Sequence, residues 1–145
     1  MKICRIYEIT EDMQKEIDLL LHELSPDFGK TDLERINGLL KSESLFLFAA
    51  MDEKNQMKGM LTLTYCPTLT GDKFWIEDVI VSPDSRGQGI GRGLVRAALD
   101  HSRRSEVSHT VYLTSNPSRT AARNLYRSEG FEEYKTGVFR IKIKG

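Results

Sequence analysis

Alternating glycines beside two arginines, between Arg86 and Gly93, form a stretch suited to holding a phosphate. The glycines occupy every second position: Gly87, Gly89, Gly91 and Gly93. Apolar and small residues at helical spacing follow, which predicts a helix beginning in this stretch. The first turn of a helix has backbone N–H groups without internal partners, and the helix dipole adds to their attraction for an anion. An ordinary strand-to-helix turn needs fewer glycines, so we expect an anion site.

The spacing within this loop excludes the two commonest nucleotide-binding motifs. A P-loop ends in Gly-Lys-Ser/Thr, whereas Gly91 is followed by Arg92 and Gly93. The dinucleotide fingerprint G-x-G-x-x-G requires a glycine at position 92 or 94, where the sequence has Arg92 and Leu94. Nucleotide hydrolysis is therefore disfavoured, and the loop is expected to hold a phosphate of another ligand.

A carboxylate pair lies in the apolar strand that precedes the loop. Phe74–Ile76 and Val79–Val81 are rich in β-branched and aromatic residues, and Pro83 ends the run. Glu77 and Asp78 interrupt it. An unpaired buried carboxylate is costly, so the pair needs either a salt-bridge partner or a chemical role. Adjacent residues of a regular strand point to opposite faces, so at most one is expected to face a reacting group directly.

A second stretch, Asn116–Phe131, strengthens the interpretation of the first. It contains Asn116 after a predicted strand, the pair Leu125-Tyr126 on a predicted helix, and the closing pair Gly130-Phe131. Together with Arg86–Gly91, read as Arg/Gln-x-x-Gly-x-Gly/Ala, this stretch resembles the motifs of the GNAT family of N-acetyltransferases. The motifs occur in the family's order and cover roughly residues 73 to 131, while the first half matches only as a pattern of elements.

The resemblance implies acetyl-CoA as co-substrate and assigns residues to its binding. The glycine loop would hold the pyrophosphate, and the strand would pair with the pantetheine arm and offer the Ile80 N–H to the developing oxyanion. Asn116 would contact the coenzyme or orient Tyr126, and Arg119 and Arg123 would approach phosphates, although a solvated helix face explains these two arginines equally well. The expected coenzyme-binding residues are Val79, Ile80, Val81, Arg86, Gly87, Gln88, Gly89, Ile90, Gly91, Arg92, Asn116, Arg119, Arg123 and Tyr126.

The reaction itself defines further roles. An alkylamine is mostly protonated at neutral pH, so acetylation needs a base, a polarised carbonyl, a proton for the leaving thiolate and a near-attack geometry. Family resemblance makes Tyr126 the acid, the alternative being a packing residue. Glu77 is the first candidate for the base and Asp78 the second, the alternative being a structural ion pair. The expected reaction is direct attack by a primary amine, of a small molecule or peptide, in a ternary complex. A non-catalytic sensor of acyl-CoA is the other function to test, since a sensor needs the loop without the acid and base.

Composition limits the remaining possibilities. The chain has 145 residues, with 21 Lys and Arg against 21 Asp and Glu. This balance argues against nucleic acid as a partner. No apolar run is long enough to cross a bilayer and the first residues do not resemble a signal peptide, so a cytoplasmic protein without a membrane partner is expected. Two cysteines and three histidines have no metal-ligand spacing, so no metal is expected. The sequence is compatible with a homodimer formed through terminal strands, and it does not identify the acceptor amine.

The pattern predicts one α/β domain over residues 1–145. The strand-helix-strand unit from residue 74 to 114 requires a parallel pair, and the resemblance implies that this pair is central and splayed in a mixed, mostly antiparallel sheet with helices on both faces. The expected elements are a strand at Lys2–Tyr7, a helix from Thr10 to Leu24, a helix opened by a Thr31–Glu34 capping box and ending near Leu40, strands at Leu45–Met51 and Met57–Tyr65, a loop at Pro67–Asp72, the strand and helix from Phe74 to about Arg104, a strand at Thr110–Thr114, a helix at about Arg119–Ser128, and a closing antiparallel pair of Phe131–Lys135 with Val138–Ile143.

Overall fold

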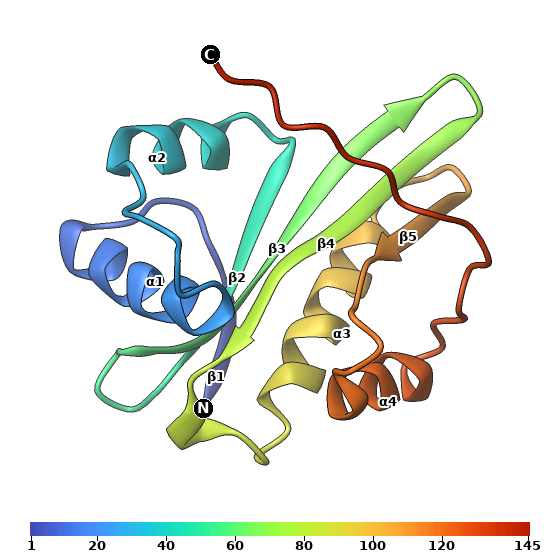
Figure 1. Ribbon diagram of the computed structural model, residues 1–145. Coiled ribbons are helices and arrows are strands. Elements are labelled where there is room, and N and C mark those ends of the chain that lie inside the picture. Colours follow the sequence, from blue (N-terminus) through green and yellow to red (C-terminus); the bar gives the residue numbers. More distant parts are fainter.

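A five-stranded sheet forms the centre of the computed structural model, which describes residues 1–145 (Figure 1). Its strands lie side by side in chain order: β1 (Lys2–Ile6), β2 (Leu45–Met51), β3 (Met57–Thr68), β4 (Gly71–Val81) and β5 (His109–Leu113). Each neighbouring pair up to β4 is antiparallel, and β4 and β5 are parallel. The predicted mixed, mostly antiparallel sheet is confirmed.

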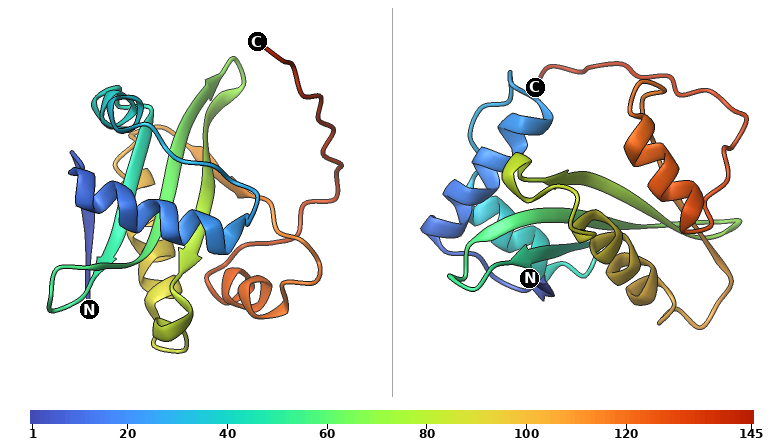
Figure 2. Two further views of the ribbon diagram at one scale, coloured as in Figure 1. Left: turned by 60° about the vertical axis from the view of Figure 1, so that its left-hand side comes forward. Right: turned by 90° about the horizontal axis from the view of Figure 1, so that it is seen from below.

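Helices cover both faces of the sheet. Figures 1 and 2 show α1 (Glu11–Leu24) and α2 (Leu33–Lys41) on one face, with α3 (Ile90–Ser102) and α4 (Thr120–Ser128) on the other. The core is accordingly divided in two. One cluster joins α3 and Tyr126 of α4 to the sheet, and the other joins α1 and Leu40 of α2 to the opposite face. Strand residues therefore alternate between two apolar layers, which explains the continuous apolar run of β2.

The caps of the first two helices show how local sequence fixes their starts. The Thr10 hydroxyl accepts a hydrogen bond from the Met13 N–H at 3.2 Å, as expected for an N-cap. The predicted capping box at Thr31 is wrong, because the cap of α2 is Asp32, which accepts from the Arg35 N–H. Thr31 instead donates its hydroxyl and its N–H to Asp18 of α1. The loop between the helices is thereby tied to α1.

The pairing of strand β4 changes on both sides near its middle. Its pairing with β5 ends where Ile76 lies opposite Leu113. On the other side, the pairing with β3 shifts register: Glu77 lies opposite Thr62, but Ile80 lies opposite Met60. Asp78 and Val79 therefore oppose the single residue Leu61, which defines a β-bulge. The predicted splayed parallel pair is present, and the split begins after Ile76. It is not central, however, because β5 is the edge strand of the sheet.

The predicted closing hairpin of Phe131–Lys135 with Val138–Ile143 is wrong. No strand follows β5, and residues 131–145 form no ladder. Alternating apolar residues favour a strand only where a partner edge is available, and local sequence does not specify that partner. The predicted loop at Pro67–Asp72 is also too long, since β3 extends to Thr68 and β4 begins at Gly71.

None of the helices combines the length and apolar character needed to span a membrane.

Candidate active site

A cavity of about 590 Å³ lies at the split between β4 and β5. The end of β4, the glycine loop with the first turn of α3, and α4 surround it, and the last turn of α1 reaches it from the other face of the sheet. Eleven of the fourteen expected coenzyme-binding residues line it: Val79, Ile80, Val81, Arg86, Gly87, Gly89, Ile90, Gly91, Arg92, Arg119 and Tyr126. Gln88, Asn116 and Arg123 do not. The structure thus brings residues that are far apart in sequence to one cavity.

The glycines of the loop have two separate functions. Gly87 and Gly89 both have φ of 78°, and a Cβ on either would meet nothing within 4 Å. These two positions need glycine for the backbone turn and leave open space above it. Gly91 and Gly93 lie inside α3, where a Cβ would approach Leu125 Cδ2 to 3.3 Å and Ile3 Cγ1 to 3.2 Å. The second pair therefore allows close packing, and only the first pair opens the backbone towards a ligand.

The edge of β4 beside the cavity has no strand partner. Beyond Ile76, β5 has left β4, so residues 77–81 present one row of backbone N–H and C=O groups towards the split. The carbonyl of Val81 accepts a hydrogen bond from Arg86 Nε at 3.1 Å. The rest of this edge can pair with an extended ligand in the manner of an added strand.

Tyr126 lies where the cavity meets the core. It is 7% exposed and packs edge-on against Phe131, with ring centroids 6.0 Å apart. Burial raises the pKa of the Tyr126 phenol, and the neighbouring Arg119 partly counteracts this. The phenol therefore keeps its proton at neutral pH, the state that a proton donor requires.

The bulge in β4 overturns the expectation that Glu77 and Asp78 face opposite sides of the sheet. Glu77 lies opposite Thr62, and the Asp78 carboxylate accepts a hydrogen bond from the Thr62 hydroxyl at 2.8 Å. Both carboxylates thus lie on the face covered by α1. Desolvation, and after it the nearby Asp78 carboxylate, raise the pKa of Glu77 above its ordinary value. Asp78 has a φ of 52°, a conformation that only a supporting environment holds in a non-glycine residue.

The expected coenzyme-binding arginines differ in whether their guanidinium groups already have partners within the protein. Arg119 takes part in none of the ion pairs of the protein, so its charge is available at the cavity. Arg92 lines the cavity, but its guanidinium donates to Ser128 and Glu129 at the end of α4. Arg123 donates to the Ser115 carbonyl and to Glu133. Arg92 and Arg123 are therefore used mainly to hold α4 in place.

Asn116 organises the turn before α4. Its side-chain oxygen accepts the Ser118 N–H at 2.9 Å and the Ser118 hydroxyl at 2.8 Å. This contact holds the turn before α4, and Asn116 does not line the cavity.

Sequence reasoning missed six residues that line the cavity: Glu23, Leu24, Ser85, Ala121, Ala122 and Leu125. Glu23 and Leu24 end α1, about fifty residues before β4, and no local motif connects them to the glycine loop. Ala121 and Ala122 lie within the second recognised stretch, and their small side chains leave room at the start of α4. The small size of these two side chains is the sequence feature that could have identified them as lining residues.

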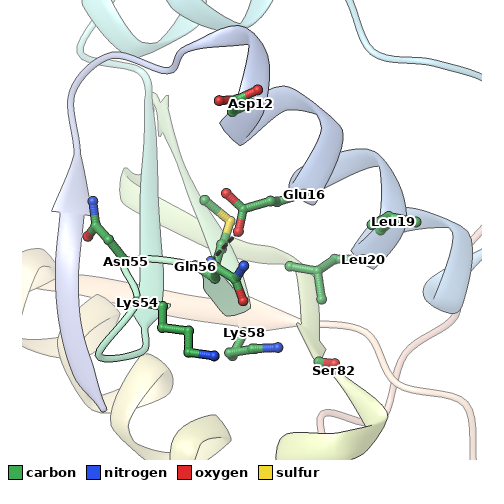
Figure 3. Close-up of a pocket in the computed structure, with 10 residues that line it drawn as sticks. Asp12, Glu16, Leu19, Leu20, Lys54, Asn55, Gln56, Lys58 and Ser82 are labelled. Atoms are coloured by element: carbon green, nitrogen blue, oxygen red, sulfur yellow. Dashed lines mark hydrogen bonds between the residues drawn. The ribbon is translucent and has the colours of Figure 1, made fainter.

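A second hollow lies on the α1 face and contains none of the expected site residues (Figure 3). It is bordered by α1, the β2–β3 turn and Ser82. Two of its four charged side chains already have partners, since Glu16 accepts the Met57 N–H and Lys58 pairs with Asp84 at 3.6 Å. The cavity at the split is therefore the better candidate for catalysis.

The sequence pattern of the acetyltransferase (GNAT) family matches residues 6–131. This chain belongs to the GNAT family. A rat protein, N-acetyltransferase family 8 member 3, is 30% identical over 128 residues, which are 87% of this chain and 51% of that protein. The chain spans about half the length of this relative and of two others.

Solved structures of GNAT acetyltransferases share the fold. An aminoglycoside acetyltransferase from an uncultured soil sample, in complex with trehalose, superimposes with a TM-score of 0.84 at 24% identity, covering 99% of this chain and 96% of that one. A predicted acetyltransferase from Clostridium acetobutylicum, solved with acetyl-CoA, gives 0.73 at 18% identity, covering 97% and 95%. At these identities the likeness establishes the fold of this GNAT chain and leaves its acceptor open.

Proposed function

We propose that this protein transfers an acetyl group from acetyl-CoA to a primary amine of a small molecule or peptide, by direct attack in a ternary complex. The observation that carries the proposal is the split in the sheet. Around the cavity at this split lie a glycine-rich helix start, an unpaired strand edge and a buried phenol, with two carboxylates at the adjacent bulge. Each requirement of acetyl transfer to an amine has a candidate group there.

The residues around the cavity suit a long, anionic thioester. The loop backbone at Gly87 and Gly89, the free Arg119 and the remaining donors of Arg86 would hold the phosphates. The edge of β4 would bind the extended arm, which brings the thioester to the bulge.

Ser82 donates its N–H to the Lys58 carbonyl of β3, so alternation along the strand turns the expected Ile80 N–H to β3 as well. The N–H groups of Val79 and Val81 face the split instead, and Val79, directly after the bulge, is the proposed donor to the carbonyl oxygen as negative charge develops.

The two proton transfers would use groups on opposite faces of β4, the carboxylates on the α1 face and Tyr126 on the α3–α4 face. Glu77 would accept the proton of the attacking amine, directly or through a water molecule, with Asp78 as the second candidate. The amine nitrogen forms its bond to the carbonyl carbon, and the carbon–sulfur bond breaks. Tyr126 would give its proton to the departing thiolate, so the products are an amide and a free thiol.

Release of free thiol from acetyl-CoA tests this function. A panel of polyamines, aminoglycosides, amino acids, amino sugars and peptide N-termini is offered to the wild type and to Tyr126→Phe. We expect turnover with at least one amine and a fall in kcat of about 100-fold or more in the variant, the lower range for loss of a general acid. Acetyl-CoA should stabilise both proteins equally against heat, because the ring stays buried. Thermal stabilisation by acetyl-CoA without turnover on any amine would indicate the sensor function instead.

A further inference from the structure

Two aromatic side chains stack on the face of the sheet that carries the proposed base. Trp75 of β4 lies opposite Tyr112 of β5, and their rings stack with centroids 4.9 Å apart and an interplanar angle of 22°. The residues on either side of each pack on the α3–α4 core, so alternation along the strands turns these two rings to the α1 face. Trp75 and Tyr112 thus form an aromatic wall one strand repeat before Glu77.

Helix α1 leaves the aromatic wall uncovered. The core beneath α1 and α2 takes in Ile80 of β4 and no earlier residue of that strand. Trp75 and Tyr112 are both partly exposed, and no ring other than that of Tyr112 stacks on the indole. The cation–π contacts of the protein all involve Arg5, so no cation of the chain lies over the indole. Exposed aromatic surface that is rimmed by polar residues is typical of a binding site.

The charged residues on this face determine which part of an acceptor each position suits. Along β4, Lys73, Trp75 and Glu77 share the α1 face, and the bulge adds Asp78 to it. Glu77 and Asp78 take part in none of the ion pairs of the protein. The two carboxylates therefore suit an amine, which is a cation before it gives up its proton. Lys73 lies on the other side of Trp75, where it repels a second cation.

We propose that the acceptor is an arylalkylamine, a primary amine with one positive charge and a flat apolar ring, whose ring packs on Trp75 while its nitrogen lies at Glu77 and Asp78. Successive residues on one face of a strand are roughly 7 Å apart, and a short alkyl spacer between nitrogen and ring can span this distance. The inference rests on the proposed acetyl transfer, and the bonds formed and broken remain those of that reaction. Trp75 is then the residue that selects the acceptor.

Acceptor preference tests this assignment. Initial rates of thiol release from acetyl-CoA are compared for phenethylamine and butylamine. Because only the first carries a ring, kcat/KM should be about tenfold higher for phenethylamine, and Trp75→Leu should abolish the difference. Tyr7→Leu is the matched control, since Tyr7 is 64% exposed and follows β1, the other edge strand of the sheet. It should keep the preference. Equal rates for the two amines, or a preference that survives Trp75→Leu, would overturn the proposal.

The diamine putrescine tests the part played by charge. Its second cation would lie at the aromatic wall, near Lys73, so putrescine should be a poorer acceptor than butylamine. Repulsion over roughly 7 Å in water amounts to about a threefold effect, so Lys73→Gln should raise kcat/KM for putrescine about threefold relative to butylamine. A wild type that prefers putrescine to phenethylamine would show that the wall holds a second cation, and the proposal would fail.

Fluorescence reports binding without turnover, because Trp75 is the only tryptophan of the chain. With CoA present, phenethylamine should change the Trp75 emission in a saturable manner, and phenethyl alcohol, which keeps the ring and lacks the charge, should bind more weakly. Thermal stabilisation by acetyl-CoA verifies that each variant is folded. Saturable binding of phenethylamine without turnover of any amine would uphold the aromatic site and refute the acetyl transfer. Turnover that does not distinguish ring from chain would do the reverse.

Discussion

The hydrogen bond from Thr62 to Asp78 is the contact whose removal tests the bulge most directly. Thr62 is 8% exposed, and its hydroxyl donates to the Asp78 carboxylate at 2.8 Å. Asp78 has its backbone at a φ of 52°, which costs a non-glycine residue roughly 1 kcal/mol. A hydrogen bond to a charged group contributes about 1.5–3 kcal/mol when it is protected from water, and we take about 1 kcal/mol because Asp78 is exposed. The bond and the strain are therefore of similar size.

Thr62→Val keeps the shape of the side chain and removes the hydroxyl. A loss of about 1 kcal/mol shifts the population of the bulge roughly fivefold towards conformers that relieve the strain. We expect kcat/KM for the amine to fall about fivefold, because Glu77, Asp78 and the Val79 N–H all depend on this conformation. The affinity for acetyl-CoA should change less, since the glycine loop does not contact Thr62.

Initial rates of thiol release, with the best acceptor from the panel, measure the effect. Thr64→Val is the matched control, since Thr64 lies one pleat further along β3 and makes only a long bond of 3.4 Å to the Trp75 carbonyl. Thr62→Ser should restore activity. If Thr62→Val and Thr64→Val both stay within twofold of the wild type, the hydroxyl does not hold the bulge and the reasoning is refuted. A variant of Thr62 that loses stability but no activity would make the bond purely structural.

Three further predictions concern pH, the α3–α4 contact and the glycine loop. As the proposed base, Glu77 accepts a proton only when it is ionised, so its raised pKa should move the acidic limb of the rate profile to higher pH. Asp78→Asn removes a repelling charge and should move that limb to lower pH, as measured from kcat/KM against pH. Arg96 and Arg92 lower the pKa of Glu129, so their contact with it stabilises the fold above the unfolded pKa of Glu129, and this stabilisation is lost as pH falls through the lowered pKa. Glu129→Gln should therefore lower Tm at neutral pH and make Tm fall less on acidification. Gly89→Ala should reduce the free energy of unfolding by about 1 kcal/mol, because Gly89 has a positive φ. Gly38 lies inside α2, where an added Cβ would meet nothing within 4 Å, so Gly38→Ala should raise the free energy of unfolding by about 0.5–1 kcal/mol. Urea denaturation measures both changes.

The parts of the site that depend on local sequence were predictable. The glycine loop works through backbone conformation and a helix start, which neighbouring residues determine, so its location followed from Arg86–Gly93 alone. The same holds for the second stretch, where Tyr126 is found at the cavity. The identity of the carboxylates was also visible, because Glu77 and Asp78 stand out in an apolar strand.

Contacts between distant segments were not predictable in the same way. Arg92 was expected at a phosphate, but its guanidinium is bound by Glu129, thirty-seven residues away. Arg123 binds Ser115 and Glu133. An arginine in a motif has the same local signature whether it faces a ligand or a carboxylate. The choice is made by packing of α3 against α4, which spacing does not reveal.

The bulge, by contrast, has a signature in the spacing of β4 itself. Phe74 and Ile76 pack on the α3–α4 core, and so do Val79 and Val81, although the interval between the two pairs is three residues instead of two. A regular strand repeats every two residues, so a fixed core face can continue only if one extra residue is inserted. The insertion falls at Glu77 and Asp78, directly after the last pair between β4 and β5. Hydrogen-bonded strands lie about 4.8 Å apart and leave no passage between them. A group on one face of the sheet can therefore reach the other face only beyond Ile76, where β4 and β5 are no longer paired. One inserted residue thus turns both carboxylates to the α1 face at the point where the sheet opens. It explains why the proposed donor and acceptor can meet from opposite faces without crossing an intact sheet.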